Sequence, residues 1–531
     1  SSSSASYVST TAPTSADNAN FGSYSGATSF TVTVDTGAVC LALVINNANM
    51  TLAGTAAWGI AGSVTITSFA SRTYTGAITF GAATATSVVL NFGTMTFAST
   101  VTFNGVNTFT LASAFNDGAS TIVLTAGTLN TAGFTVTCGT FNISGAVLRT
   151  LNLGASTLTL SSATGWTATT TTNLTFSAGT STIQMSSSGP TFAGGSLTYN
   201  NVSFTSGAAT TLIISGANTF NNLTFASRSS VGISVINPSA NQTITGTLTI
   251  PAPTTLGSSR YQVFSNTFGT TRTITAAAVS LTDVDFRDIT GAGAATWSGT
   301  RLGNGGGNSG ITFPAAKTVY WNLAGTNNWS ATGWALTQTG APAATNFPLA
   351  QDTAIFTDTN PGSTDVITIN AAYNLGTIDF SLRTIALTVT SSLSLAVYGS
   401  TTLSPAITMS GSATWTYAGR GSTQVITSAG RTWSQSIGVS NIGGTVQLGD
   451  ACTRSTAVTL TYGTLDLNNY ALTCTTFSSS NSNTRTLAFG ASGSITVTGT
   501  GTVFSTSTTT GLTISGTNPI VNRTNATATA T

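Results

Sequence analysis

The sequence contains no histidine and no glutamate, and charged residues make up only 5% of its 531 residues. A typical soluble domain carries about 25% charged residues. Without histidine, the chain cannot build a catalytic triad that uses an imidazole base, and it lacks the commonest metal ligand. The twelve aspartates are therefore the only carboxylate side chains available for chemistry. These absences favour a structural role over an enzymatic one.

Positive charge is equally sparse. Thirteen arginines are scattered singly from Arg72 to Arg523, Lys317 is the only lysine, and the net charge is +2. The sequence therefore has no basic patch of the kind that binds nucleic acid, and we expect no nucleic-acid partner. No apolar run approaches the roughly 20 residues needed to cross a bilayer, so we expect no membrane insertion.

The cysteines also exclude a class of site. Cys40, Cys138, Cys452 and Cys474 form no C-x-x-C pair, and the chain has no histidine to complete a metal site. A zinc site is therefore not expected. We interpret the four as small buried hydrophobic residues. A contact between Cys452 and Cys474 on neighbouring coils is an alternative for that pair.

Short runs of alternating apolar and polar residues dominate the chain, for example "TFTL", "TIVLT" and "STLTLS". Alternation indicates strands with one buried face and one face of threonine and serine in solvent. We therefore predict an all-β protein. An elongated parallel β-solenoid built of repeated units fits best, because stacked coils need only small residues at their corners. Tandem β-sandwich modules are the alternative.

The sequence repeats itself over a long distance. The phrase "GTLNTAGFTVTC", which starts at Gly127, returns as "GTLDLNNYALTC" from Gly463. The match extends downstream and aligns Arg149 with Arg485. The repeat predicts three segments, namely repeat unit 1 at 1–183, a middle solenoid segment at 184–347 and repeat unit 2 at 348–531.

A tryptophan-rich boundary at 319–334 leads into the second unit with the phrase "VYWNLAGTNNWSATGW". We interpret its tryptophans as a packing element between units. The first unit has only "SSSSASYVST" in the equivalent place. Its lead-in is therefore expected to be truncated, and the chain is expected to be a window on a longer array.

The length of one coil is indicated by a shorter repeat. The phrases "YNNVSF" and "FNNLTF" begin at Tyr199 and Phe220, which are 21 residues apart. If one phrase lies directly above the other, the asparagine pairs are in register. We expect them to stack into ladders of side-chain amides at a turn of the coil.

These phrases, the tryptophan-rich lead-in and the "GTLDLNNYALTC" stretch resemble the low-charge, repeat-rich fibre proteins of tailed phages. They also resemble the repeats of large bacterial surface adhesins. The resemblance covers nearly all of the chain. It implies an extended fibre in an extracellular setting or on a virion surface, with no catalytic residues. The implied partners are cell-surface glycans or other fibre subunits, with a homotrimer or a fibre assembly among the arrangements to test.

One acidic segment stands out. The stretch "LTDVDFRDIT" gathers Asp283, Asp285 and Asp288. In a strand, the first two lie on the same side, roughly 6–7 Å apart. Three interpretations stay open. The segment is a solvated or arginine-paired strand face, a calcium site completed by backbone carbonyls, or the acid and base of a glycosidase. Calcium is the only cofactor that the sequence suggests.

The sequence thus favours a structural, non-enzymatic fibre or surface filament, and in particular a virion tail or capsid fibre that mediates attachment. The alternatives are a bacterial cell-surface adhesin, a polysaccharide-cleaving tailspike, and an ice-binding solenoid that uses its rows of threonine. The scarcity of ionisable groups also predicts a stability that responds little to salt or pH.

Overall fold

The structure of the chain is a computed structural model that describes residues 13–22, 29–81, 86–208, 210–359, 365–525 and 527–531. Strands succeed one another through all of these residues, and the one helical element among them is the 3₁₀ helix Ala344–Asn346. The strands pair in parallel from coil to coil, which confirms the parallel β-solenoid and makes the β-sandwich alternative wrong. The lead-in at 1–10, for which truncation was predicted, lies outside the described residues.

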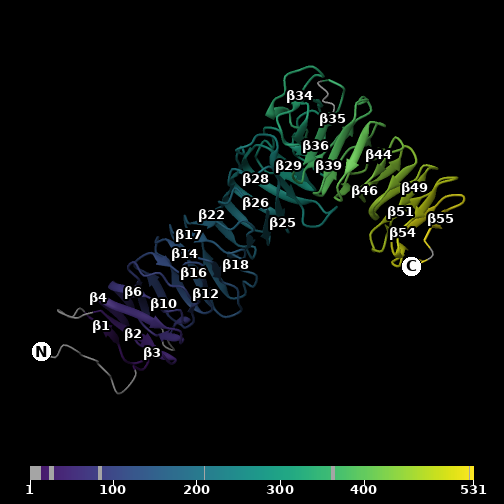
Figure 1. Cartoon of the computed structure of the whole chain (residues 1–531). Helices are drawn as coiled ribbons and strands as arrows, with labels where there is room; N and C mark the ends of the chain where they lie inside the picture. Colours follow the sequence, from purple (N-terminus) through teal and green to yellow (C-terminus); the bar gives the residue numbers. More distant parts are fainter. Residues whose placement is uncertain (1–12, 23–28, 82–85, 209, 360–364, 526) are drawn as a thin grey trace.

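Figure 1 shows two arms that meet at an angle. The first arm runs from β1 (Ala19–Phe21) to β31 (Gly303–Asn304) and has three sheets of nine, nine and thirteen strands. The second arm runs from β32 (Thr318–Trp321) to β56 (Ala528–Ala530). Within each arm the chain visits the faces in turn, so every coil lies on the coil before it.

Each arm has its own hydrophobic core, and the break between the cores differs from the boundaries of the sequence repeats. One core extends from Ala19 to Leu302 and the other from Val319 to Val503. Near residue 183, β20 (Thr182–Met185) pairs with the preceding and the following coil without interruption. The predicted boundary at 183 therefore marks a repeat in the sequence and no break in the fold.

Ladders of like residues fill the interior. Along one face of the first arm, inward-facing side chains from five successive coils lie opposite one another: Val88, Phe109, Leu129, Leu151 and Phe176. Four of the five are at most 1% exposed, and Phe176 packs against the same core. Burial of such a side chain contributes about 1.5–3 kcal/mol. Repetition of this small term along the coils stabilises the rod.

The two copies of the long repeat have the same register. In the first, β13 (Gly127–Asn130) pairs with β16 (Arg149–Asn152) so that Gly127 lies opposite Arg149. In the second, β48 (Val458–Asp466) pairs with β51 (Arg485–Ala488) so that Gly463 lies opposite Arg485. Equivalent phrases therefore form equivalent rungs in the two arms.

Arg149 and Arg485 are both 1% exposed and hold the coils together from inside. Arg149 donates hydrogen bonds of 2.7–2.9 Å to the backbone carbonyls of Ile143, Val147, Thr170 and Thr172. Arg485 donates to the carbonyls of Ser479, Asn483, Thr508 and Thr510. Burial lowers the pKa of both guanidinium groups. Each arginine thus supplies several donors to carbonyls that two neighbouring coils leave inside the turn.

The predicted amide ladder is present. In β22 (Thr198–Phe204) and β24 (Thr219–Phe225), Tyr199 lies opposite Phe220. Asn221 Nδ2 donates to Asn200 Oδ1 at 3.2 Å, and Asn222 Nδ2 donates to Asn201 Oδ1 at 2.9 Å. The asparagines lie where the inward side of the strand changes, because Tyr199 and Val202 are both buried. The ladder therefore marks a corner of the coil.

The tryptophans of the boundary segment begin the second core. Trp321, Trp329 and Trp334 are at most 5% exposed and surround the ring of Phe356. Trp321 stacks on this ring, Trp329 is tilted against it and Trp334 meets it edge-on, all of which are favourable aromatic geometries. The four cysteines are likewise buried, and none is in a disulfide. Cys452 lies opposite Leu472 on the next coil.

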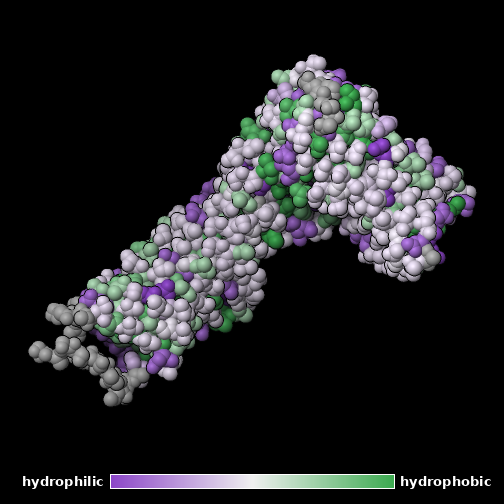
Figure 2. Space-filling model, viewed as in Figure 1, coloured by the Kyte–Doolittle hydropathy of each residue, from purple (hydrophilic) through white to green (hydrophobic). Residues whose placement is uncertain are grey.

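Threonine, serine and glycine determine the hydropathy of the molecular surface. Figure 2 shows a surface of mostly intermediate hydropathy, with the most hydrophobic residues of this view gathered around the meeting of the two arms. The described residues include no helix with the length and hydropathy that spanning a bilayer requires.

Candidate functional site

The acidic segment singled out in the sequence lies at the junction of the two arms. Asp285 belongs to β29 (Val284–Arg287), which lies between β27 (Ser259–Phe264) and β31. Asp283 and Asp288 flank this strand in the left-handed conformation, with φ of 55° and 57°. Aspartate tolerates this conformation better than most residues do. The three carboxylates are each at most 1% exposed.

Asp283 and Asp285 converge on one buried arginine. Arg260, 2% exposed, donates from Nη1 to Asp283 Oδ1 at 3.0 Å and from Nε to Asp285 Oδ1 at 2.8 Å. Arg301 donates to both oxygens of Asp283, at 2.7 and 2.5 Å. Burial by itself would lower the pKa of Arg260, but the charges of Asp285 and Asp283 outweigh burial and raise it. Arg260 therefore remains charged, and together with Arg301 it pairs with the buried carboxylates.

One hydrogen bond and one ion pair connect the carboxylates of this cluster to the second arm. Asn374 Nδ2 donates to Asp285 Oδ2 at 2.9 Å. Arg420 forms an ion pair with Asp288. Glycine is required where the connecting chain crosses these carboxylates, because a Cβ at Gly303 would lie 2.0 Å from Asp285 Oδ1 and one at Gly307 would lie 2.2 Å from Asp288 Oδ1.

Both chemical interpretations of the acidic segment must account for these partners. Arginine donors occupy Asp283 and Asp285, and Asp288 lies at the other end of the strand against Arg420. Within the described ranges, no group of three metal-ligating side chains is arranged to hold an ion. A calcium site at Asp283, Asp285 and Asp288 stays a prediction, and it requires calcium to displace guanidinium groups.

Chelation tests that prediction. Because guanidinium groups already neutralise the carboxylates, we expect the melting temperature in EDTA to equal that in millimolar calcium. The measurement is a thermal scan followed by circular dichroism at low ionic strength. A melting temperature that falls on chelation and recovers on addition of calcium would support the calcium site. Magnesium serves as the control cation, since its strict octahedral geometry suits a different site.

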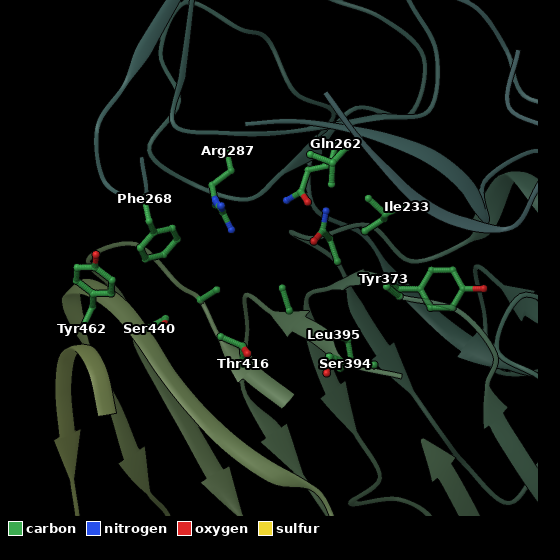
Figure 3. Close-up of a pocket in the computed structure, with 15 residues that line it drawn as sticks. Ile233, Gln262, Phe268, Arg287, Tyr373, Ser394, Leu395, Thr416, Ser440 and Tyr462 are labelled. Carbon is green, nitrogen blue, oxygen red and sulfur yellow. The ribbon is translucent and has the colours of Figure 1, made fainter. Parts of the chain in front are cut away.

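A cleft of about 490 Å³ lies beside this cluster, between the two arms. The first arm contributes Ile233, Val235, Gln262, Phe268 and Arg287. The second arm contributes ten residues, among them Tyr373, Asn374, Leu395, Thr416, Ser440 and Tyr462. Figure 3 shows Arg287 and Gln262 directed from the first arm toward the strands of the second, with Phe268 beside Tyr462. Ligand sites commonly occupy such concave, mostly apolar surfaces between domains.

Direct contacts hold the walls of the cleft together. The rings of Phe268 and Tyr462 lie 5.3 Å apart between centroids. Gln262 Nε2 donates to the Tyr398 hydroxyl at 3.3 Å, and the backbone N–H of Ile233 donates to the carbonyl of Ala372 at 3.1 Å. The cleft is therefore a feature of the packed junction.

Arg287 is the positively charged residue of the cleft. Its guanidinium carbon lies 4.5 Å from the ring centroid of Phe264 and 4.6 Å from that of Phe268. Its Nε has no hydrogen-bond partner among the described residues and lies 3.8 Å from Asp288 Oδ2. The Tyr398 hydroxyl lies nearby; burial raises the pKa of Tyr398, and Arg287 offsets this only in part. Arg287 is thus oriented by aromatic rings and incompletely neutralised.

A second surface with functional potential is a ladder of threonines on the first arm. Thr108, Thr128, Thr150 and Thr175 lie opposite one another on four successive coils. They are 20, 22 and 25 residues apart in the sequence, yet the parallel register aligns them. Loops of different length absorb the difference, so an irregular sequence spacing produces a regular array with rungs about 4.8 Å apart.

Comparison of the chain with protein-family models, with curated proteins and with solved structures finds no match. The class of the protein therefore depends on its own geometry. It is a two-armed parallel β-solenoid with a charged, cleft-bearing junction between the arms.

Proposed function

We propose that the chain is a structural, non-enzymatic segment of a fibre or surface filament that mediates attachment. The observation that carries this proposal is the parallel hydrogen-bond ladder that links coil to coil along each arm, in sheets of up to thirteen and sixteen strands. Every coil is bonded to the coils on either side, so the fold supports extension and stiffness without help from a compact lobe. Such a body suits a spacer that displays binding surfaces at a distance.

The polar outer face supports an adhesive role. Hydroxyl groups repeat along the threonine ladder, and each can make only a weak contact. Several weak contacts on one rigid body act together, which raises the overall avidity without any strong single site. Cell-surface glycans, which are rich in hydroxyl groups, are the proposed partners, together with other subunits of the same fibre.

Burial of the acidic segment supports the proposal of a non-enzymatic role. A glycosidase needs two carboxylates that reach the scissile bond, one of them as a proton donor. Asp283 and Asp285 are each 1% exposed and are occupied by Arg260 and Arg301. The proposed setting is extracellular or the surface of a virion, and a virion tail or capsid fibre is preferred over a bacterial adhesin on the sequence resemblance alone.

Binding and cleavage assays test the proposal together. We expect the purified chain to adhere to immobilised polysaccharide with a retention that rises steeply with glycan density. We also expect it to release no new reducing ends from soluble polysaccharide. Release of reducing ends that disappears in both Asp283→Asn and Asp285→Asn, in variants whose circular dichroism shows that they stay folded, would instead establish a tailspike enzyme. Retention that is independent of density would contradict the avidity mechanism.

Ice binding is a second candidate, favoured by the regular register of the threonine ladder. A flat hydroxyl array on a rigid face is the feature that this activity needs. Thermal hysteresis of a concentrated solution tests ice binding. A freezing point below the melting point supports ice binding, and the absence of such a difference removes this candidate. Thr128→Val and Thr150→Val alter the middle of the array and serve as matched variants.

A further inference from the structure

The cleft between the arms has a composition that neither the threonine ladder nor the buried ion pairs share. It combines one incompletely neutralised cation, several aromatic rings and uncharged polar groups. The ion pairs at the junction link five cations, Arg260, Arg287, Arg301, Lys317 and Arg420, with four carboxylates, Asp283, Asp285, Asp288 and Asp352. One positive charge is therefore in excess.

That excess charge is located at Arg287. Its separation from Asp288, 3.8 Å, is the longest of the junction ion pairs, and Arg420 holds the other oxygen of the same carboxylate. The guanidinium lines the cleft, and its Nε is buried without a hydrogen-bond partner among the described residues. A planar guanidinium binds a carboxylate through two parallel hydrogen bonds. The cleft is therefore complementary to a ligand with one negative charge.

The remaining lining selects among monoanions. Gln262 and Asn374 present amides at the cleft. The N–H groups of these amides are engaged with Tyr398 and Asp285, which leaves their oxygens as acceptors. Thr416 and Ser440 also line the cleft. Phe268 and Tyr462 add aromatic surface. This set suits a ring with apolar C–H faces, several hydroxyls and one carboxylate.

We propose that the cleft binds an acidic sugar residue of a surface glycan, with Arg287 on the sugar carboxylate. The ring lies against Phe268 and Tyr462. The amide oxygens of Gln262 and Asn374 and the hydroxyls of Thr416 and Ser440 bind the sugar hydroxyls. The volume of about 490 Å³ lies within the usual range for small-molecule sites, roughly 300–1,000 Å³. This inference depends on the proposed attachment function and gives it a specific ligand class.

A phosphate-bearing ligand fits less well. A phosphate dianion is usually bound by several cations or by a row of backbone N–H groups at a helix N-terminus or Gly-rich loop. Among the residues that line the cleft, Arg287 is the one cation, and most of the lining residues lie in strands. One cation among hydroxyl and amide groups favours a sugar acid.

The test is calorimetric titration of the whole chain with a tri-galacturonate oligosaccharide at low salt. We expect saturable binding that weakens at least about tenfold when the carboxylates are methyl-esterified. Inorganic phosphate at the same concentration should not compete. Equal affinity for the acid and the ester, or displacement by phosphate, would overturn the proposal, as would the absence of any binding at millimolar oligosaccharide.

Variants locate the site. Arg287→Gln should reduce the affinity for the acid at least about tenfold and leave the affinity for the ester unchanged, whereas Arg287→Lys should retain part of the binding. Arg431→Gln, outside the cleft, is the matched control. Melting curves identify a variant that has lost its fold, and in that case the comparison of acid with ester on the unmodified chain decides. Adhesion to polysaccharide without any response to galacturonate would overturn this inference and leave the proposed function standing.

Discussion

Replacing Asp283 with asparagine is expected to lower the free energy of unfolding by about 3–5 kcal/mol, the usual cost of removing one partner from a buried ion pair. Asparagine keeps the size of the side chain and tolerates the left-handed backbone at this position, where φ is 55°. The change therefore removes the charge at nearly constant size, and it also places an amide NH2 group where the carboxylate accepts hydrogen bonds from Arg260, Arg301 and Gly257. Arg260 keeps one carboxylate partner, Asp285, whereas Arg301 loses the one ion-pair partner that it has among the described residues.

Urea unfolding followed by circular dichroism measures this effect, and small-angle scattering of the folded variant shows whether the arms separate. Asp35→Asn is the control, because Asp35 is exposed and far from the junction in the fold. The variant should also lose cooperativity between the two cores. A shift in unfolding free energy below about 1 kcal/mol, the value of a surface ion pair, would contradict the role assigned to Asp283.

Stability should fall as the pH rises from about 4 to about 8, because of Asp117. This residue is fully buried between β11 (Phe115–Asn116) and β12 (Thr121–Leu124), and its carboxylate oxygens have no hydrogen-bond partner among the described residues. Burial raises the pKa of Asp117 from 3.8 to about 8. The backbone of Ser99, which lies near the carboxylate but outside hydrogen-bond geometry, and the charge of Arg72 lower this pKa only in part. The folded state therefore binds the proton more tightly than the unfolded state does.

The sign and the size of the effect follow from linkage. Below pH 4 both states are protonated and the stability is greatest; between pH 4 and 8 only the folded state keeps the proton, so each unit of pH lowers the unfolding free energy by about 1.4 kcal/mol. The total is on the order of 5 kcal/mol, and the curve flattens above pH 8. Asp117→Asn should remove this slope and leave the variant more stable than the parent at pH 9.

Chemical denaturation at pH 5, 7 and 9 provides the measurement, with Asp35→Asn as the control that should keep the slope. A parent protein with the same unfolding free energy at all three pH values would show that Asp117 does not titrate as its burial requires. It would then agree with the expectation, drawn from the low charge, that stability responds little to pH.

Features that arise within one coil or between adjacent coils could be predicted from the sequence. The spacing of 21 residues between Tyr199 and Phe220 predicts their pairing, and the amide ladder follows from the same register. Alternation likewise predicts which side chains face inward, because a strand has a period of two. These signals are local, so no knowledge of the distant chain is required.

The junction could not be predicted in this way. Its bonds join residues far apart in the sequence, such as Asp285 with Asn374 and Asp288 with Arg420, and no repeated phrase marks these pairs. Asp117 was missed for another reason. It stands in "FNDGAS", which is typical of an exposed turn. Only the packing of neighbouring coils buries its carboxylate, and a single sequence contains no signal for that burial.

The angle between the two arms has a mechanical consequence. When a tethered molecule is pulled at its ends, each arm acts as a lever and the load becomes a torque about the joint. Within an arm, many parallel hydrogen bonds share the applied force. At the junction between the arms, the force falls on a few contacts, among them Arg420 with Asp288 and Asn374 with Asp285. Tension is therefore expected to separate the two arms at their junction before it unfolds a coil.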